Sequence, residues 1–249
     1  MIELNKIYNE DCLEGMKRIS DGSIDMILCD LPYGTTQNKW DSIIPFEKLW
    51  EQYERIIKGD GAIVLTGQQP FTSQLVMSNI KHFRYEWIWE KELGTGFLNA
   101  KKMPLKNHEN ILVFYKHLPT YNPQFTTGKP RTSFSNNTSS NYGKYKQVIY
   151  DNPDGNRYPL SIQKFIAYQN RGIHPTQKPV ALFEYLIKTY TNKGETVLDN
   201  CMGSGTTAIA CLNTDRNFIG FETNKEYYDK SLERIKNNVT QLDLFEEAK

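Results

Sequence analysis

Residues 196–208 read Thr-Val-Leu-Asp-Asn-Cys-Met-Gly-Ser-Gly-Thr-Thr-Ala. The apolar run at the start of this stretch is typical of a short buried strand, and it ends in Asp199. Gly203, Gly205 and Ala208 have the G-x-G-x-x-G/A spacing, which lets bare backbone and a helix N-terminus face a ligand. The stretch therefore predicts a strand, a tight turn and a helix that bind an adenosine-containing cofactor, unless the glycines serve packing alone.

A second strand pattern follows this turn. Residues 217–221 read Asn-Phe-Ile-Gly-Phe and are followed by Glu222, whose carboxylate is suited to the hydroxyls of a ribose. After it the pattern predicts one more helix, over residues 225–239. A doubly wound sheet needs more strands than these two, so we expect the others to come from earlier in the chain. The prediction is an α/β fold with a doubly wound, mostly parallel, Rossmann-like sheet.

The N-terminal part contains a second group of residues suited to chemistry. A buried strand predicted over residues 23–29 leads into Asp30-Leu31-Pro32-Tyr33-Gly34, at the edge of the sheet where ligands bind in α/β folds. Pro32 restrains the backbone and leaves nearby carbonyls available, while Tyr33 supplies a flat ring. A carboxylate, a carbonyl and a ring together suit an exocyclic amine on a planar heterocycle. The plainer interpretation is a strand that ends in a Pro-Tyr-Gly turn.

Charge is unevenly distributed along the chain of 249 residues, although its formal net charge is only +1. Residues 116–178 contain nine Lys or Arg and two Asp, a net charge of +7, which leaves −6 for the remainder. Residues 118–172 are rich in Asn, Ser, Thr and Tyr, and residues 132–141 approach low complexity. Tyrosines interleaved with basic residues suit phosphate contacts and base stacking, so we expect a polyanion-binding insertion rather than a segment without a role.

The remaining elements follow from hydrophobic periodicity and turn residues. The predicted strands cover residues 5–8, 61–67, 84–90 and 109–115, and the predicted helices cover residues 45–58, 70–80 and 180–190. Residues 91–107 are predicted to form a loop over the edge of the sheet where ligands bind. The polar segment 35–41 contains Trp40, which either closes over a substrate or packs the loop down.

The cysteines and the N-terminal residues indicate the cellular compartment. The four cysteines are scattered and lack metal-ligand spacing, so we expect reduced thiols and no metal. The first residues lack the pattern of a secretory leader, and no apolar run is long enough to span a bilayer. These observations predict a cytoplasmic protein that does not contact membranes.

A third motif, His174-Pro175-Thr176-Gln177-Lys178-Pro179, precedes the helix that leads to the glycine turn. By itself, Lys178 either pairs with a ligand carboxylate or is a solvated charge. Together with Asp30–Tyr33 and Leu198–Thr207, this motif resembles the β class of DNA amino-methyltransferases, in which the catalytic motif precedes the cofactor motif. The resemblance covers nearly the whole chain apart from the basic insertion, and it implies a circularly permuted order in which N-terminal strands complete the C-terminal unit.

The resemblance implies roles for individual residues. The catalytic residues would be Asp30, Pro32 and Tyr33, which hold and stack the target base. The residues that bind S-adenosylmethionine would be Asp11, Cys12, Asp30, Thr176, Lys178, Asp199, Gly203, Ser204, Gly205, Thr206 and Glu222. The expected DNA-binding residues are Trp40, Lys129, Arg131, Lys144, Lys146 and Arg157. The catalytic domain would comprise residues 1–117 and 173–249, and the target-recognition insertion would comprise residues 118–172.

The sequence departs from the family pattern at two places. Leu31 stands where the family usually has Pro, and Asn200-Cys201 stands where it usually has Pro-Phe. The first change leaves the carboxylate, the second proline and the ring in place, so we expect activity. The second removes an aromatic ring near the cofactor and changes the local packing. Asp11 also has a simpler interpretation, as a helix N-cap.

The resulting expectation is an enzyme that methylates the N6 amine of adenine in duplex DNA after turning the base out of the helix. Asp at the first motif position favours adenine, but cytosine N4 is chemically alike and stays an alternative. A catalytically silent DNA-binding subunit, a nicotinamide-dependent oxidoreductase and a methyltransferase of RNA or protein are further alternatives. Expected partners are duplex DNA and a cognate restriction endonuclease, in a bacterial or phage setting, with the enzyme a monomer or a homodimer.

Overall fold

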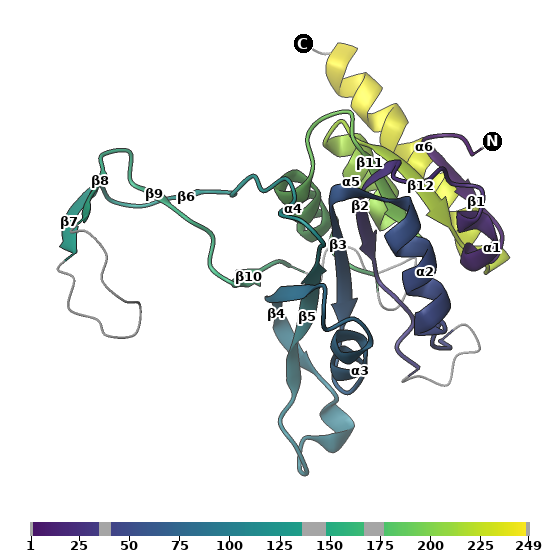
Figure 1. The fold of residues 1–249 in the computed structure, drawn as a ribbon, viewed down its shortest axis with the longest axis horizontal. Helices are drawn as coiled ribbons and strands as arrows, with labels where there is room; N and C mark the ends of the chain where they lie inside the picture. The colour runs from purple at the N-terminus through teal and green to yellow at the C-terminus, as the bar shows by residue number, and fades with distance from the viewer. Residues whose placement is uncertain (1, 35–40, 136–147, 167–176, 248–249) are drawn as a thin grey trace. The chain divides into compact units, whose positions relative to one another are not determined.

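The computed structural model describes residues 2–34, 41–135, 148–166 and 177–247. Its central sheet has the strand order β1–β12–β11–β2–β3–β5–β4–β10 (Figure 1). Neighbouring strands pair in parallel except at β5, which runs antiparallel to both β3 and β4. The strands of this sheet are β1 (Lys6–Tyr8), β2 (Ile24–Cys29), β3 (Ile57–Gly67), β4 (Phe83–Thr95), β5 (Lys106–Phe114), β10 (Ile162–Lys164), β11 (Thr196–Asp199) and β12 (Asn217–Phe221). The expected mostly parallel sheet is confirmed.

The C-terminal strands lie inside the N-terminal part of the sheet. Strand β11 pairs with β2, with Val197 opposite Met26 and Leu198 opposite Ile27. Strand β12 pairs with β1 on the other side of β11. The expected completion of the C-terminal unit by N-terminal strands is therefore observed. Because β2 and β11 are adjacent and parallel, the segments that follow them leave the same edge of the sheet.

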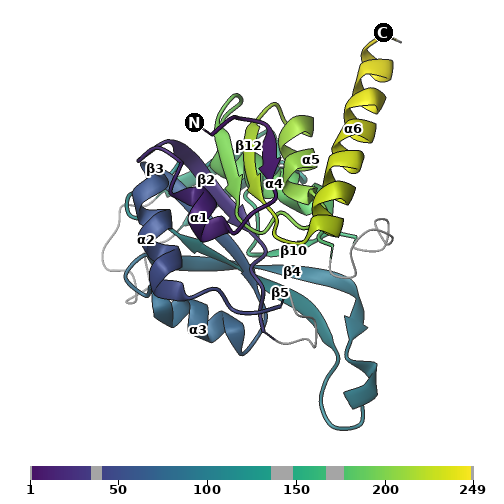
Figure 2. The same cartoon turned by 90° about the vertical axis from the view of Figure 1, so that its right-hand side faces the viewer.

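Helices cover both faces of the sheet (Figure 2). Helices α1 (Cys12–Met16), α2 (Phe46–Ile56) and α3 (Phe71–Ser78) pack on one face, and α4 (Val180–Tyr190), α5 (Thr206–Asn213) and α6 (Lys225–Glu247) lie on the other. Strand residues alternate between the two cores, so that Met26 and Leu28 meet the α4–α5 side while Ile27 and Cys29 meet the α1–α3 side. This alternation follows from the two-residue period of a strand.

Local sequence explains the main elements. In α2, Leu49, Trp50, Tyr53 and Ile56 fall on one side of the helix and are buried. All four residues of β11 are buried because helices cover both faces of the strand. Each Leu, Ile or Phe so buried contributes about 1.5–3 kcal/mol through removal of apolar surface from water.

The prediction of a loop over residues 91–107 is wrong at its two ends, which belong to strands, and holds for residues 96–105 between them. Strand β4 continues to Thr95, a 3-10 turn η1 (Phe97–Asn99) follows, and β5 starts at Lys106. These residues form a β-hairpin that extends beyond the helices (Figure 2). A hairpin that leaves the sheet has no core face, so its sequence lacks the alternation that identifies buried strands.

Residues Pro123–Leu160 form a second compact unit, whereas residues 1–122 and 161–249 form the first. In the second unit β6 (Thr126–Thr127) pairs with β9 (Asn156–Arg157), and β7 (Arg131–Ser135) pairs with β8 (Val148–Asn152). This unit is narrower than the expected insertion 118–172, because β10 adds to the edge of the large sheet beside β4.

Candidate active site

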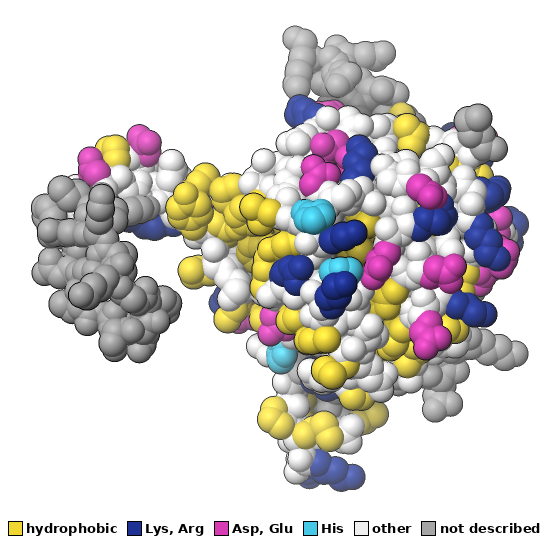
Figure 3. Space-filling model, viewed as in Figure 1, with side chains coloured by type: hydrophobic (Ala, Val, Ile, Leu, Met, Phe, Trp, Pro, Cys, Tyr) yellow, Lys and Arg dark blue, Asp and Glu magenta, His cyan; other side chains and the backbone are white. Residues whose placement is uncertain are grey.

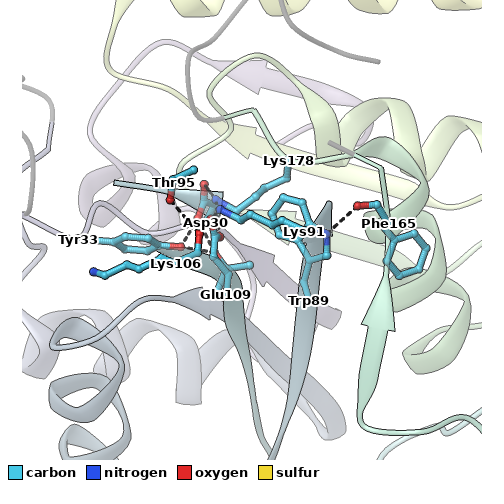
Figure 4. Close-up of polar contacts among 10 residues, drawn as sticks. Asp30, Tyr33, Trp89, Lys91, Thr95, Lys106, Glu109, Phe165 and Lys178 are labelled. Carbon is cyan, nitrogen blue, oxygen red and sulfur yellow. Dashed lines mark hydrogen bonds and ion pairs between the residues drawn. The ribbon is translucent and has the colours of Figure 1, made fainter. Parts of the chain in front are cut away.

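Asp30 lies at the carboxyl end of β2 and accepts three hydrogen bonds (Figure 4). The hydroxyls of Tyr33 and Thr66 donate to Oδ1, the first over 2.7 Å, and Lys178 Nζ lies 2.5 Å from Oδ2. Burial alone would raise the pKa of Asp30, but the charge of Lys178 and these hydrogen bonds hold it below its usual value. Asp30 is therefore a carboxylate at neutral pH.

Lys178 is 5% exposed and lies between two carboxylates. Besides Asp30, its Nζ is 3.2 Å from Oε2 of Glu109, and Lys91 donates to Oε1 of the same Glu109. Burial alone would lower the pKa of Lys178, but Asp30 and Glu109 raise it above its usual value. The structure thus pairs Lys178 with protein carboxylates, and its expected contact with a cofactor carboxylate stays a prediction.

Sequence reasoning did not identify Glu109 or Thr66 as site residues. Thr66 is the penultimate residue of β3, which runs parallel to β2, and the last residue, Gly67, pairs with Asn110 of β5. Because β5 is antiparallel, its amino-terminal end reaches the edge where the parallel strands have their carboxyl ends. The rule that site residues follow parallel strands would have found Thr66, but it cannot find Glu109.

Tyr33 is held from two directions. Its hydroxyl contacts Asp30 and lies 2.9 Å from the Thr66 hydroxyl, while its ring stacks on Phe71 with centroids 5.1 Å apart. Phe71 thus packs against the Tyr33 ring, and Lys178 Nζ lies over the same ring, 5.7 Å from its centroid. The expected contact of Tyr33 with a base stays a prediction. Leu31, at the position where the family usually has Pro, is 4% exposed and packs into the core on the α1–α3 side.

The glycine turn after β11 has the backbone that the sequence predicts. Gly203 and Gly205 have φ values of 53° and 81°, in the left-handed region that a side chain would strain. Asp199 accepts a hydrogen bond from the Cys201 N–H over 3.0 Å and another from the Thr207 hydroxyl. Burial raises the pKa of Asp199 to about 6, although these two bonds oppose the rise.

Glu222 lies directly after β12 and next to this turn. Its carboxylate accepts hydrogen bonds from the N–H groups of Gly203 and Asn224, over 2.8 and 2.7 Å. Burial raises the pKa of Glu222 above its usual value. The side chain of Asn9 donates to the Glu222 carbonyl over 2.7 Å, which ties the end of β12 to the turn after β1. A fixed acceptor of this kind fits vicinal hydroxyls, as the expected ribose contact requires.

The consecutive residues Gln177 and Lys178 connect the glycine turn to Asp30. Gln177 Oε1 accepts from the Ser204 hydroxyl over 3.2 Å, and the next residue, Lys178, pairs with Asp30. Arg234 of α6, which sequence reasoning did not single out, donates to the Ser204 carbonyl and to the Thr206 hydroxyl over 3.0 and 3.1 Å. The expected meeting of the loops near residues 30 and 203 at one edge is therefore observed.

Asp11 caps helix α1, accepting from the Leu13 and Glu14 N–H groups over 2.8 and 3.2 Å. The N-cap interpretation of Asp11 is thus observed, and its contact with the adenine of a cofactor stays a prediction, as does that of Cys12. The Cys12 thiol is buried and lies 3.6 Å from the side-chain nitrogen of Asn200, and hydrogen bonding to Cys201 together with burial raises its pKa.

The departure at Asn200-Cys201 is accommodated by polar packing. The Tyr53 hydroxyl donates to the Asn200 side-chain oxygen, and the Asn200 side-chain nitrogen contacts the Cys12 and Cys201 thiols. Burial raises the pKa of Cys29, on the neighbouring strand, to about 12. All four cysteines are free thiols. Three of them, Cys12, Cys29 and Cys201, are far apart in the sequence but lie close together beside the glycine turn.

Of the expected DNA-binding residues, three are described and lie in the second unit. Lys129 and Arg131 are exposed, while the Arg157 guanidinium donates to the Lys129 carbonyl over 2.5 Å and so helps to hold that unit together. The other residues expected to bind DNA, Trp40, Lys144 and Lys146, and the expected cofactor contact Thr176 lie outside the described residues.

The described residues contain no group of three or more His, Cys, Asp or Glu side chains arranged to hold a metal ion. They also contain no helix with the length and apolarity needed to cross a bilayer.

Sequence comparison defines the class to which this site belongs. The N6/N4 methyltransferase family, described as DNA methylase, matches residues 24–233. The chain belongs to this family of DNA methylases, which confirms the resemblance seen in the motifs.

Individual relatives agree with this assignment. The chain is 28% identical to the type II methyltransferase M.HpaI of Haemophilus parainfluenzae over 97% of its length and 77% of that protein. It is also 28% identical to the DNA adenine methyltransferase YhdJ of Escherichia coli strain K12, over 94% of this chain and 83% of that one.

Solved structures share the fold. The crystal structure of the M1.HpyAVI–SAM complex superposes with a TM-score of 0.62 at 26% identity, over 92% of this chain and 98% of the other. The cytosine-N4-specific PvuII DNA methyltransferase superposes with a TM-score of 0.64 at 16% identity, over 95% of this chain and 91% of the other. The second likeness concerns the fold alone.

Proposed function

We propose that this DNA methylase transfers a methyl group from S-adenosylmethionine to the N6 amine of adenine in duplex DNA, after the base is turned out of the helix. The observation that carries the proposal is the placement of the Asp30 carboxylate and the glycine turn on adjacent parallel strands. The Gln177–Lys178 pair connects these two groups.

Asp30 is suited to accept a hydrogen bond from the target amine. A carboxylate has about four acceptor positions, and the described residues occupy two on Oδ1 and one on Oδ2. The fourth, on Oδ2, is left for an N–H of the base. Accepting this bond draws the amine nitrogen towards tetrahedral geometry and makes its lone pair available. Because Lys178 keeps the pKa of Asp30 low, the carboxylate is a weak base and acts as an acceptor rather than a proton carrier. The methyl–sulfur bond breaks as the methyl–nitrogen bond forms, and the proton that the methylated amine then loses goes to water.

The described cofactor-side groups fit S-adenosylmethionine. Glu222 offers a fixed acceptor for ribose hydroxyls, and Gly203 leaves half-buried backbone without a side chain in the turn before α5. Gly205 is buried, and a Cβ atom there would lie 3.1 Å from the Ser231 Cβ of α6. Asp199 and the Ser204–Thr206 turn complete the proposed contacts, with Asp11, Cys12 and Thr176. When bound, the cofactor supplies an electrophilic sulfonium methyl group. The protein's contribution is mainly to place the amine and the donor in line.

Recognition of DNA is assigned to the second unit together with Trp40. Residues 123–160 contain five Lys or Arg and two Asp, a net charge of +3, as phosphate binding requires. The basic residues proposed to contact DNA are Lys129, Arg131, Lys144, Lys146 and Arg157. The relation to type II methyltransferases also makes a cognate restriction endonuclease a proposed partner.

Adenine is favoured because Asp stands first in the Asp30–Tyr33 motif and because a relative carries the name DNA adenine methyltransferase. Cytosine N4 is the second candidate, since the family includes both chemistries. The test is to incubate the purified protein with genomic DNA and S-adenosylmethionine carrying a labelled methyl group, and to identify the labelled nucleoside after digestion. N6-methyl-2′-deoxyadenosine is expected. N4-methyl-2′-deoxycytidine would replace the adenine assignment, and cofactor binding without labelled DNA would favour a silent DNA-binding subunit.

A further inference from the structure

The hairpin between β4 and β5 presents apolar side chains to solvent. Phe97 is 80% exposed, Leu98 98% and Met103 52%. Two more exposed apolar residues, Leu93 and Leu105, lie on the two arms of the same hairpin. A cluster of this kind is uncommon on a protein surface that contacts only water, and it indicates a binding surface.

The tip is a hydrogen-bonded structure rather than an unravelled loop end. Gly96 has a φ of 89°, and its carbonyl accepts from the Asn99 N–H over 2.9 Å. The Asn99 carbonyl in turn accepts from the Met103 N–H over 3.0 Å. Across the arms, a Cβ atom on Gly94 would lie 2.7 Å from the Leu105 Cβ, so the glycine allows the two strands to approach closely. The backbone that carries the exposed side chains is therefore ordered, which lowers the entropic cost of binding a partner there.

Positive charge surrounds this apolar tip. Lys101, Lys102 and Lys106 are exposed, and Glu92 is the one acidic residue between residues 92 and 106, which gives a net charge of +2. In Figure 3 the lower end of the molecule shows hydrophobic side chains next to Lys and Arg. A second copy of the hairpin would bring like charges together, whereas a nucleic acid supplies both phosphates and flat apolar bases.

The hairpin is also a direct continuation of the active site. Its last ladder pair, Thr95 with Lys106, lies three residues along β5 from Glu109, which contacts Lys178. At the rise of a strand this is roughly 10 Å, and the tip extends further. The distance of about 10 Å from Glu109 to the start of the hairpin is similar to the width of a DNA groove, about 6–12 Å. A duplex with one base in the Asp30 site would therefore contact the hairpin.

We propose that the hairpin tip is a DNA wedge: Phe97 and Leu98 enter the base stack near the nucleotide that is turned out, and Lys101 and Lys102 bind the flanking phosphates. Apolar side chains inserted between base steps stabilise a distorted duplex, and so offset part of the cost of extruding a base. This inference rests on the proposed function, because it requires DNA as the substrate.

The first test is the double variant Phe97→Ala/Leu98→Ala, assayed by transfer of labelled methyl groups to genomic DNA. The KM for DNA is expected to rise about tenfold or more, as for loss of a base-stacking contact, while the Kd for S-adenosylmethionine stays unchanged. The matched control is Met77→Ala/Ile80→Ala, which removes two apolar side chains that are 70% and 57% exposed on and just after α3. This control is expected to behave as the wild type.

The second test measures salt dependence of DNA binding for Lys101→Gln/Lys102→Gln. The slope of log affinity against log salt concentration is expected to fall in magnitude by about 2, since each phosphate contact contributes about 0.9. Lys81→Gln/Lys188→Gln, at the opposite end of β4 and at the end of α4, is the control with an unchanged slope.

The outcomes separate the two proposals. A wild-type protein that binds S-adenosylmethionine but methylates no DNA contradicts the proposed function. An active wild type with Phe97→Ala/Leu98→Ala indistinguishable from the Met77→Ala/Ile80→Ala control overturns the wedge alone. Loss of a dimer in sedimentation, with an unchanged KM for DNA, would also overturn it and assign the tip to self-association.

Discussion

The two halves of the site are built in different ways. The half proposed to bind the cofactor (the cofactor half), with Asp199, Gly203 and Glu222, relies on short hydrogen bonds to backbone N–H groups within one strand–turn–helix–strand unit. The half around Asp30 instead relies on side-chain charges from β2, β5 and the segment before α4. A half held by backbone groups tolerates a changed side chain, whereas a buried ion network leaves a charge uncompensated when one member is lost.

The largest effect is expected at the acceptor itself. Asp30→Ala removes the group that orients the amine, so methyl transfer to DNA should fall by about 10²–10⁴-fold, the usual contribution of such a group. The Kd for S-adenosylmethionine should change by only a few-fold, because most of the proposed cofactor contacts, including Asp199, Gly203 and Glu222, lie on other segments and are kept. Asp21→Ala, at a carboxylate whose side chain is 77% exposed, is the control. Full turnover in Asp30→Ala would remove Asp30 from the mechanism.

The next effect concerns stability of the ion network. Lys178→Met leaves the carboxylates of Asp30 and Glu109 without their shared cation, so the free energy of unfolding in urea should fall by about 3–5 kcal/mol. Lys164→Met removes a surface pair with Glu90, 3.3 Å apart, and should cost less than about 1 kcal/mol. Adding Glu109→Gln to Lys178→Met should restore part of the loss. If the double variant recovers none of the lost unfolding free energy, Glu109 does not interact with Lys178.

The third effect is a dependence of the unfolding free energy on pH, which we expect from Asp199 in the cofactor half. The folded-state pKa of Asp199 is raised from 3.8 to about 6, so its charged form is disfavoured in the folded protein. Below pH 3.8 the carboxyl is protonated in both states and no penalty exists, whereas above pH 6 the full penalty applies. In the wild type, the contribution of Asp199 to stability therefore falls as pH rises from about 4 to 6.

The variant Asp199→Asn isolates this contribution. The difference in unfolding free energy, variant minus wild type, should increase by up to about 3 kcal/mol between pH 4 and pH 7. Denaturant titrations at several pH values measure it. Asp215→Asn, on the surface beside Lys193, lacks the burial penalty and should not show the increase. A flat difference for Asp199→Asn would show that its burial has no such cost.

The smallest effect is expected in the cofactor half. Glu222→Gln keeps an oxygen that can accept from the Gly203 N–H, so the turn should persist, and the Kd for S-adenosylmethionine should rise about tenfold through loss of a charged acceptor. The kcat at saturating cofactor should stay near that of the wild type. Glu226→Gln, at an exposed pair with Lys230, is the matched control. A collapse of kcat with an unchanged Kd would reverse the roles assigned to the two halves.

The two halves also differ in how many of their residues could be predicted from the sequence. Asp199, Gly203 and Glu222 are close in sequence, and each follows a predicted parallel strand, so local pattern was enough to group them. Asp30 was found by the same rule. Glu109 was missed because it lies near the amino-terminal end of an antiparallel strand, and Arg234 was missed because it lies in the middle of a helix. Their contacts depend on strand direction and helix placement, which local pattern does not encode.

Sequence alone determined the alternation of strands and helices, the glycine turn, the Asp30 motif and the family, because these depend on periodicity and on backbone conformations that few residues allow. Tertiary structure decided that β11 and β12 lie between β1 and β2, that Lys178 is shared between Asp30 and Glu109, and that residues 91–106 project as a hairpin. These features arise where segments distant in the chain meet, and the energy of a buried charge depends on which neighbours surround it.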